Sequence, residues 1–133
     1  MRHDPASEFS PFEEWLSVEK TSDPYVFQLS FEEHHLGNPV IRSIHGGVVG
    51  ALIEYVAKAG LNFRLQQIDR QANVDLTSTS LEYLRVTKDA PVYAKCEIIR
   101  VARRIGFVDV WCWQDSEELM VTRGICTLRI SDR

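Results

Sequence analysis

Hydrophobic positions along the chain change their spacing after the segment Gly46 to Gln67, and this change divides the sequence into two kinds of element. That segment contains no proline, is rich in Ala, Leu, Ile and Val, and has few polar residues before Asn62. The pattern predicts a helix that is apolar, and therefore buried, nearly all round. At about 1.5 Å per residue the helix would be about 30 Å long, the width of a small domain.

Beyond the helix, hydrophobic residues recur at every second position, which is typical of strands. Short turns separate the runs, so we expect antiparallel pairing as a meander or near-meander. One long helix and an antiparallel sheet predict an α+β fold in which the sheet curls around the helix. The strand-like runs are Val74–Val86, Val92–Val101, Gly106–Gln114 and Leu119–Ile130.

The residues before the helix predict a few short elements. Residues 1–10 are interpreted as a loose tail, and Pro11–Leu16 as a short helix with proline in its first turn. Tyr25–Phe31 alternates as a strand does, and Glu32–Pro39 is a loop rich in turn-forming residues. We therefore expect a single domain over residues 1–133.

Composition and charge limit the classes of partner. Hydrophobic residues make up 44% of the chain and charged residues 26%, an ordinary globular balance. The longest apolar stretch, around Val48 to Ile53, is far too short to cross a bilayer. A net charge of −4 would repel nucleic acid and anionic membranes, so we expect neither as a partner. A phosphate-bearing ligand would need a local basic patch.

The cysteines and the N-terminus indicate the compartment. Cys96, Cys112 and Cys126 are far apart in apolar surroundings and form no CxxC motif, so neither a disulfide framework nor a zinc site is predicted. The polar residues Met1–Pro5 lack the apolar run of a signal peptide. We expect buried free thiols, no bound metal and a cytoplasmic location.

The candidate chemistry lies at the start of the long helix. His45, Gly46 and Gly47 precede a carboxylate, Glu54, about two and a half turns further along. Glycines let a ligand approach the backbone, and the first helical amides suit an oxygen that gains negative charge. Glutamate in an apolar stretch usually has a partner or a function. The alternatives are a surface pair between Glu54 and Lys58 and a capping role for His45.

The stretch Asn38 to Glu54, together with Ser80–Arg85 and Ile99–Arg104, resembles the PaaI-type branch of the hotdog-fold acyl-CoA thioesterases. That branch includes phenylacetate-pathway thioesterases and, more distantly, 4-hydroxybenzoyl-CoA thioesterases. The resemblance implies a helix wrapped by five or six strands. It also implies subunits that join sheet edges into a homodimer, commonly paired into a tetramer, with each active site between two subunits.

The resemblance also implies roles for individual residues in hydrolysis of an acyl-CoA thioester. Glu54 matches the catalytic acid, as general base or nucleophile, and the Gly46 amide matches the donor that polarises the carbonyl. Asn38 matches a residue that orients water or substrate, and Thr77, or its neighbour Thr79, a hydroxyl from the partner subunit. No metal or organic cofactor is implied, since CoA is part of the substrate. The substrate-binding residues are His45 and Gly47 at the helix start, and Arg85, Arg103 and Arg104 near the CoA phosphates.

Two other functions remain open. A hotdog hydratase or dehydratase would need a histidine opposite the acid, for which His35 and Glu54 are the candidates. A non-catalytic acyl-CoA binding module would keep the fold without chemistry. For the acyl group, the sequence offers several large aromatic residues that are either core or cavity: Tyr55, Phe63, Tyr83, Trp111 and Trp113.

Overall fold

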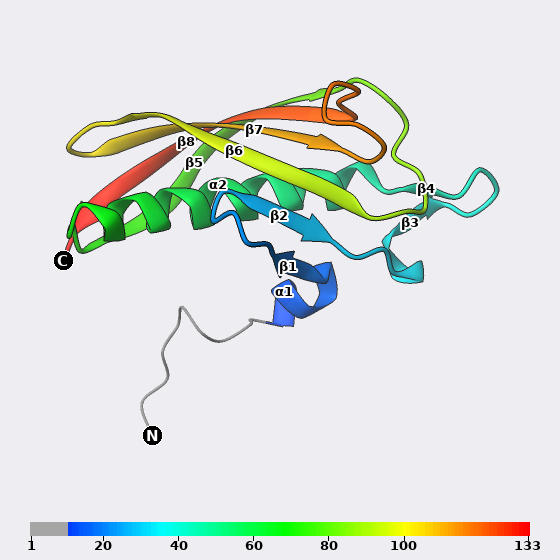
Figure 1. Ribbon diagram of the computed structural model, residues 1–133, viewed down its shortest axis with the longest axis horizontal. Helices are drawn as coiled ribbons and strands as arrows, with labels where there is room; N and C mark the ends of the chain where they lie inside the picture. Colours follow the sequence, from blue (N-terminus) through cyan, green and yellow to red (C-terminus); the bar gives the residue numbers. More distant parts are fainter. Residues whose placement is uncertain (1–10) are drawn as a thin grey trace.

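The computed structural model describes residues 11–133 and consists of a curved sheet with one long helix lying across its concave face (Figure 1). The tail expected at residues 1–10 lies outside the described residues. In chain order the elements are α1 (Pro11–Leu16), β1 (Val18–Lys20), β2 (Val26–Leu29), the 3₁₀ turn η1 (Glu33–His35), β3 (Leu36–Asn38), β4 (Ser43–Ile44), α2 (Gly46–Gln67), β5 (Ala72–Tyr83), β6 (Val92–Val101), β7 (Ile105–Trp113) and β8 (Thr122–Asp132).

The main sheet has six antiparallel strands in the order β1-β2-β6-β7-β8-β5. Strands β6, β7 and β8 form a meander, and β5 pairs with β8 instead of with its next neighbour in sequence, β6. The near-meander prediction is therefore confirmed, and β5 becomes an edge strand of 12 residues. The α+β class and the sheet curled around a helix are confirmed as well.

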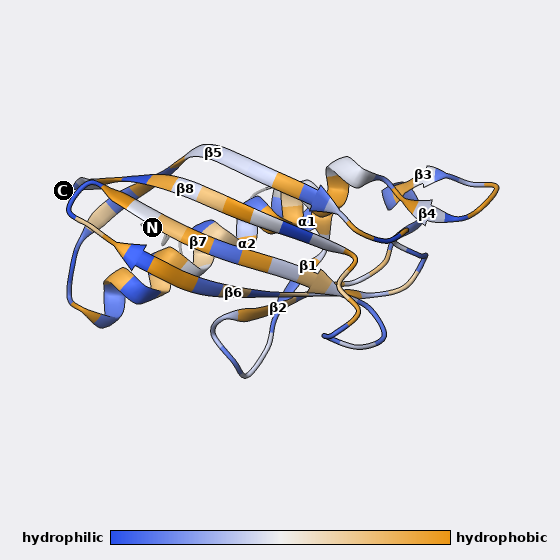
Figure 2. Ribbon diagram, turned by 90° about the horizontal axis from the view of Figure 1, so that it is seen from above, coloured by the Kyte–Doolittle hydropathy of each residue, from blue (hydrophilic) through white to orange (hydrophobic). Residues whose placement is uncertain are grey.

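Period-two patterning places the core between α2 and the sheet. Val108, Val110 and Cys112 of β7 are fully buried against the helix. Trp111, on the opposite face of the strand, is partly exposed, whereas Asp109 on that face is 8% exposed. The same alternation of hydrophobic and hydrophilic bands runs along the strands in Figure 2. On the helix side, Leu52, Ile53, Val56 and Leu61 are completely buried.

The helix was predicted with its observed bounds, but its burial was not. Gly47, Glu54 and Lys58 are exposed along one stripe of α2, so the expectation of a helix buried nearly all round is wrong for the single chain. The reason is that the sheet covers only one side of the helix. Among residues 11–133 there is also no helix with the length and apolar character needed to span a membrane.

Three further details differ from the sequence prediction. Strand β5 ends at Tyr83 instead of Val86. Strand β1 was not expected, and the loop predicted at Glu32–Pro39 contains the turn η1 and strand β3. Strand β3 pairs with β4 in a small hairpin that projects beyond the N-terminal end of α2 (Figure 1).

Candidate functional site

The first turn of α2 leaves one backbone amide without an acceptor. His45 is the N-cap residue, and its Nδ1 accepts a hydrogen bond of 2.9 Å from the Gly47 amide. Its carbonyl oxygen accepts the amide of Val48 at 2.9 Å and that of Val49 at 3.4 Å. Within residues 11–133 no acceptor is bonded to the amide of Gly46. This N–H is therefore the donor that the helix start offers to a ligand oxygen.

Tyr83, at the end of β5, fixes this turn from the side of the sheet. Its hydroxyl donates to the carbonyl oxygen of Gly46 at 2.9 Å. A Cβ atom added at Gly46 would lie 3.3 Å from the Tyr83 ring, and one at Gly50 would lie 3.1 Å from Leu81. Glycine at these positions lets α2 approach the edge strand closely. The sequence suggested Tyr83 only as a core or cavity residue, and its role in positioning the helix start was not predicted.

Glu54 lies eight positions after Gly46 and is exposed in the single chain. The alternative of a pair with Lys58 is not observed, because no ion pair joins these two side chains in the described part of the chain. The carboxylate is near enough to Cys126 of β8 to act on its thiol electrostatically. Burial raises the pKa of the Cys126 thiol to about 11, and the negative charge of Glu54 adds to that rise.

Gly46 and Glu54 lie well apart along one helix, although they would have to act on neighbouring atoms of the reaction. Eight residues of helix correspond to a rise of about 12 Å. A base must come within about 3 Å of the proton that it removes, and the amide within about 3 Å of the carbonyl oxygen. The helix of one chain therefore presents the Gly46 amide and the Glu54 carboxylate at two separate positions, about two turns apart.

A β-bulge in β5 determines which threonine faces the helix. The register with β8 shifts between Leu76 and Ser78, so Thr77 is the extra residue, and its hydroxyl donates to the Thr127 carbonyl at 3.0 Å. After the bulge, the faces of the strand are exchanged. The Thr79 hydroxyl then lies 3.8 Å from the Cys126 sulfur, on the side of the strand that faces α2. Of the two predicted candidates, Thr79 and not Thr77 therefore points its hydroxyl toward α2 of the same chain.

Asn38 has a structural task in the β3–β4 hairpin. Its Oδ1 accepts the amide hydrogens of Val40 at 3.0 Å and of Ile41 at 3.4 Å, which stabilises the turn. The amide nitrogen of its side chain is the group left to contact water or substrate.

The three arginines predicted to contact CoA lie apart. Arg85 is exposed in the segment that follows β5. Arg103 and Arg104 are exposed in the β6–β7 turn, where the Arg103 carbonyl accepts a hydrogen bond from the Arg70 guanidinium. That turn lies at the C-terminal end of α2, opposite to the end at which the helix begins (Figure 1). Within one chain they do not form a single patch with Arg85.

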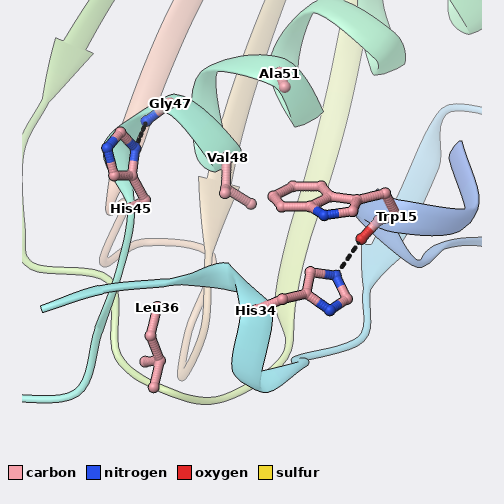
Figure 3. Close-up of a pocket in the computed structure, with 7 residues that line it drawn as sticks. All are labelled: Trp15, His34, Leu36, His45, Gly47, Val48 and Ala51. Carbon is pink, nitrogen blue, oxygen red and sulfur yellow. Dashed lines mark hydrogen bonds between the residues drawn. The ribbon is translucent and has the colours of Figure 1, made fainter. Parts of the chain in front are cut away.

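A cavity of about 330 Å³ lies beside the helix start (Figure 3). It includes the predicted binding residues His45 and Gly47, but none of the five aromatic residues suggested by the sequence. Its aromatic wall comes from Trp15 of α1. The lining residues are Trp15, His34, Leu36, His45, Gly47, Val48 and Ala51.

His35 has no free ring nitrogen for catalysis. Its side chain is completely buried, and burial lowers its pKa. Its Nδ1 accepts the Glu32 amide at 3.1 Å, and its Nε2 is 3.0 Å from the carbonyl oxygen of Trp15, which requires the proton on Nε2. The dehydratase alternative thereby loses the histidine that it needs. In residues 11–133 there is also no cluster of His, Cys, Asp or Glu that could hold a metal ion.

Comparison with known proteins identifies the family and the fold of this chain. The model of one protein family, the acyl-CoA thioesterase N-terminal domain, matches residues 35–129. No curated relative matches the sequence. Several solved structures are similar.

AziG of S. sahachiroi is 22% identical with a TM-score of 0.81, and the alignment covers 95% of this chain and 100% of AziG. A phenylacetic acid degradation-related protein of Ralstonia eutropha is 18% identical with a TM-score of 0.78, with 92% of each chain covered. The BH2602 protein of Bacillus halodurans, solved with CoA, is 14% identical with a TM-score of 0.78, and the coverage is 92% of this chain and 77% of that one. At these identities the structures show the hotdog fold alone.

Proposed function

This chain belongs to the family of the acyl-CoA thioesterase N-terminal domain, and from that premise we propose that it hydrolyses an acyl-CoA thioester to a free acid and CoA. The observation that carries the proposal is the amide of Gly46 at the start of α2, which has no acceptor within residues 11–133, combined with the exposed carboxylate of Glu54 on the same helix. A donor for a developing oxyanion and a carboxylate base are the two groups that thioester hydrolysis needs.

In the proposed reaction the thioester carbonyl accepts the Gly46 amide hydrogen bond. Glu54 removes a proton from water while the water oxygen bonds to the carbonyl carbon, and the tetrahedral oxyanion forms at the amide. The C–S bond then breaks, and the CoA thiolate leaves and takes up a proton. A direct attack by Glu54, followed by hydrolysis of the mixed anhydride, gives the same products. Neither route uses a metal or an organic cofactor.

We propose that the two groups of one active site come from two subunits, because their backbone positions in one chain are about 12 Å apart along the helix. A twofold axis that brings the partner's Glu54 close to this chain's Gly46 must pass beside α2, level with its midpoint between these residues at Gly50. Gly50 packs on Leu81 of the edge strand β5, so the axis would pass through that unpaired edge. Antiparallel pairing of two β5 edges would also satisfy their free backbone groups. A tetramer could form by pairing two such dimers.

Apolar side chains around the end of β5 support this interface. Tyr83, Leu84 and Val86 are 55%, 51% and 64% exposed in the single chain. Three large exposed apolar side chains within four residues are typical of a surface that a partner covers. In this dimer we assign secondary roles to Asn38 and to Thr77 or Thr79, and contacts with the CoA phosphates to Arg85, Arg103 and Arg104. The buried free thiols fit the proposed cytoplasmic location.

The activity is tested directly with a panel of acyl-CoA substrates of different acyl groups. We expect release of free CoA thiol, followed with a chromogenic thiol reagent, and equimolar free acid. The same panel distinguishes the proposal from a binding module, which would bind acyl-CoA in calorimetry without releasing thiol. Absence of turnover for every substrate would contradict the proposed hydrolase activity, although the fold would be unaffected.

Mixing two inactive variants tests the shared active site. One chain carries Glu54→Gln and the other Gly46→Pro, and the two are combined by reversible unfolding. A hybrid dimer then contains one site with both defects and one intact site, so we expect random mixing to restore about a quarter of the wild-type activity. Native mass spectrometry confirms that hybrids form. If hybrids form and activity stays at the level of the separate variants, each active site is built from one chain.

A further inference from the structure

We propose that Trp15 is the specificity-determining residue that limits the length of the acyl chain. This inference rests on the proposed function and deepens it, because it assigns the 330 Å³ cavity to the acyl group of the substrate. Trp15 and His34 both lie before residues 35–129, the part of the chain that the family model matches. The element that sets specificity would thus be an addition to the matched domain.

The position of the cavity connects it with the proposed chemistry. His45 and Gly47, which flank the free amide of Gly46, line the cavity at one side. Trp15 lies at the other side, with Val48 between His45 and the indole ring in the view of Figure 3. A thioester whose carbonyl oxygen binds the Gly46 amide can therefore extend its acyl group from the helix start toward Trp15.

The chemistry of the lining favours an uncharged acyl group over the CoA portion. No Asp, Glu, Lys or Arg is present among the lining residues of the described chain, and Leu36, Val48 and Ala51 provide aliphatic contacts. CoA carries phosphates, which proteins bind with cations. Ligand pockets usually span about 300–1,000 Å³, so this cavity suits one moiety of a substrate and not the whole molecule.

Trp15 is held firmly enough to act as an end wall. Its backbone carbonyl accepts the Nε2–H groups of both His34, at 2.6 Å, and His35, at 3.0 Å. The His34 ring lies against the indole with a centroid distance of 4.7 Å, and the next residue, Leu16, is completely buried in the core. Trp15 as a residue is 44% exposed, so a smaller side chain at this position would open the cavity outward.

The test measures kcat/KM for a series of saturated acyl-CoAs from C4 to C12 with wild-type protein, Trp15→Ala and Trp15→Phe. We expect the ratio of kcat/KM for C10 over C4 to rise about tenfold or more in Trp15→Ala, with Trp15→Phe between the two. Trp111→Ala is the matched control, since Trp111 lies on the outer face of the sheet. Its ratio should equal that of the wild type.

A second readout keeps the test independent of turnover. Binding of non-hydrolysable thioether analogues, S-acetonyl-CoA and its long-chain alkyl ketone homologue, is measured by calorimetry in the same variants. The expected result is tighter binding of the long homologue by Trp15→Ala. An equal loss for all chain lengths, in turnover or in binding, overturns the assignment of Trp15. If the wild type turns over no substrate but Trp15→Ala still binds the long homologue more tightly, the proposed hydrolysis is refuted and the role of Trp15 in limiting chain length is supported.

Discussion

Replacement of Glu54 by glutamine is expected to lower kcat for acyl-CoA hydrolysis by about 10²–10⁴-fold while KM changes little. Glutamine has nearly the same size and shape as glutamate, but its amide neither accepts a proton from water nor attacks a carbonyl carbon. The loss should therefore appear in the chemical step. The measurement is thiol release under saturating substrate, with KM from the same progress curves.

The fold of this variant should be intact, because Glu54 is exposed and no ion pair in the described chain depends on its charge. Glutamine and glutamate also have similar helix propensities. Thermal unfolding should give the wild-type midpoint. Glu97→Gln makes the same chemical change at an exposed position of β6 and should keep full activity. Equal activities of the two variants would remove Glu54 from the site.

The fold was predictable from the sequence wherever a long regular pattern encodes it. The segment Gly46–Gln67 has no proline and a continuous apolar interior, and it forms a helix with the predicted bounds. Strand β6 was likewise predicted to the residue. Local features could not be predicted in this way. The bulge at Thr77 depends on the partner strand β8, and the strands β1 and β3, with 3 residues each, are too short to show an alternating pattern.

The candidate site could be predicted from the sequence only where its residues lie close together along the chain. His45, Gly46 and Glu54 fall on one loop and one helix, so their order alone indicates a site. Tyr83 reaches Gly46 across 37 positions, and Trp15 meets His34 and His35 across 19 and 20. Contacts at such separations are products of the folded topology, and no spacing rule reveals them. For the same reason the exposure of Glu54 could not be predicted from its apolar neighbours.

The second large effect is expected when proline replaces Gly46, because proline removes the amide hydrogen that we assign to the oxyanion. Gly46 is the first residue of α2, where proline is well tolerated. The preceding residue must avoid the helical region, and His45, at φ −59° and ψ 132°, already does. The helix should therefore form normally, which circular dichroism and thermal unfolding would check.

Gly46→Pro should lower kcat/KM by about 10²–10³-fold, the usual effect of losing one oxyanion donor. Gly46→Ala is the matched control, since it adds a Cβ at the same place, 3.3 Å from the Tyr83 ring, but keeps the N–H. Any loss caused by crowding of Tyr83 appears in both variants, and the difference between them measures the amide alone. If alanine and proline reduce activity equally, crowding explains the loss, and the carbonyl oxygen is bound by a different donor.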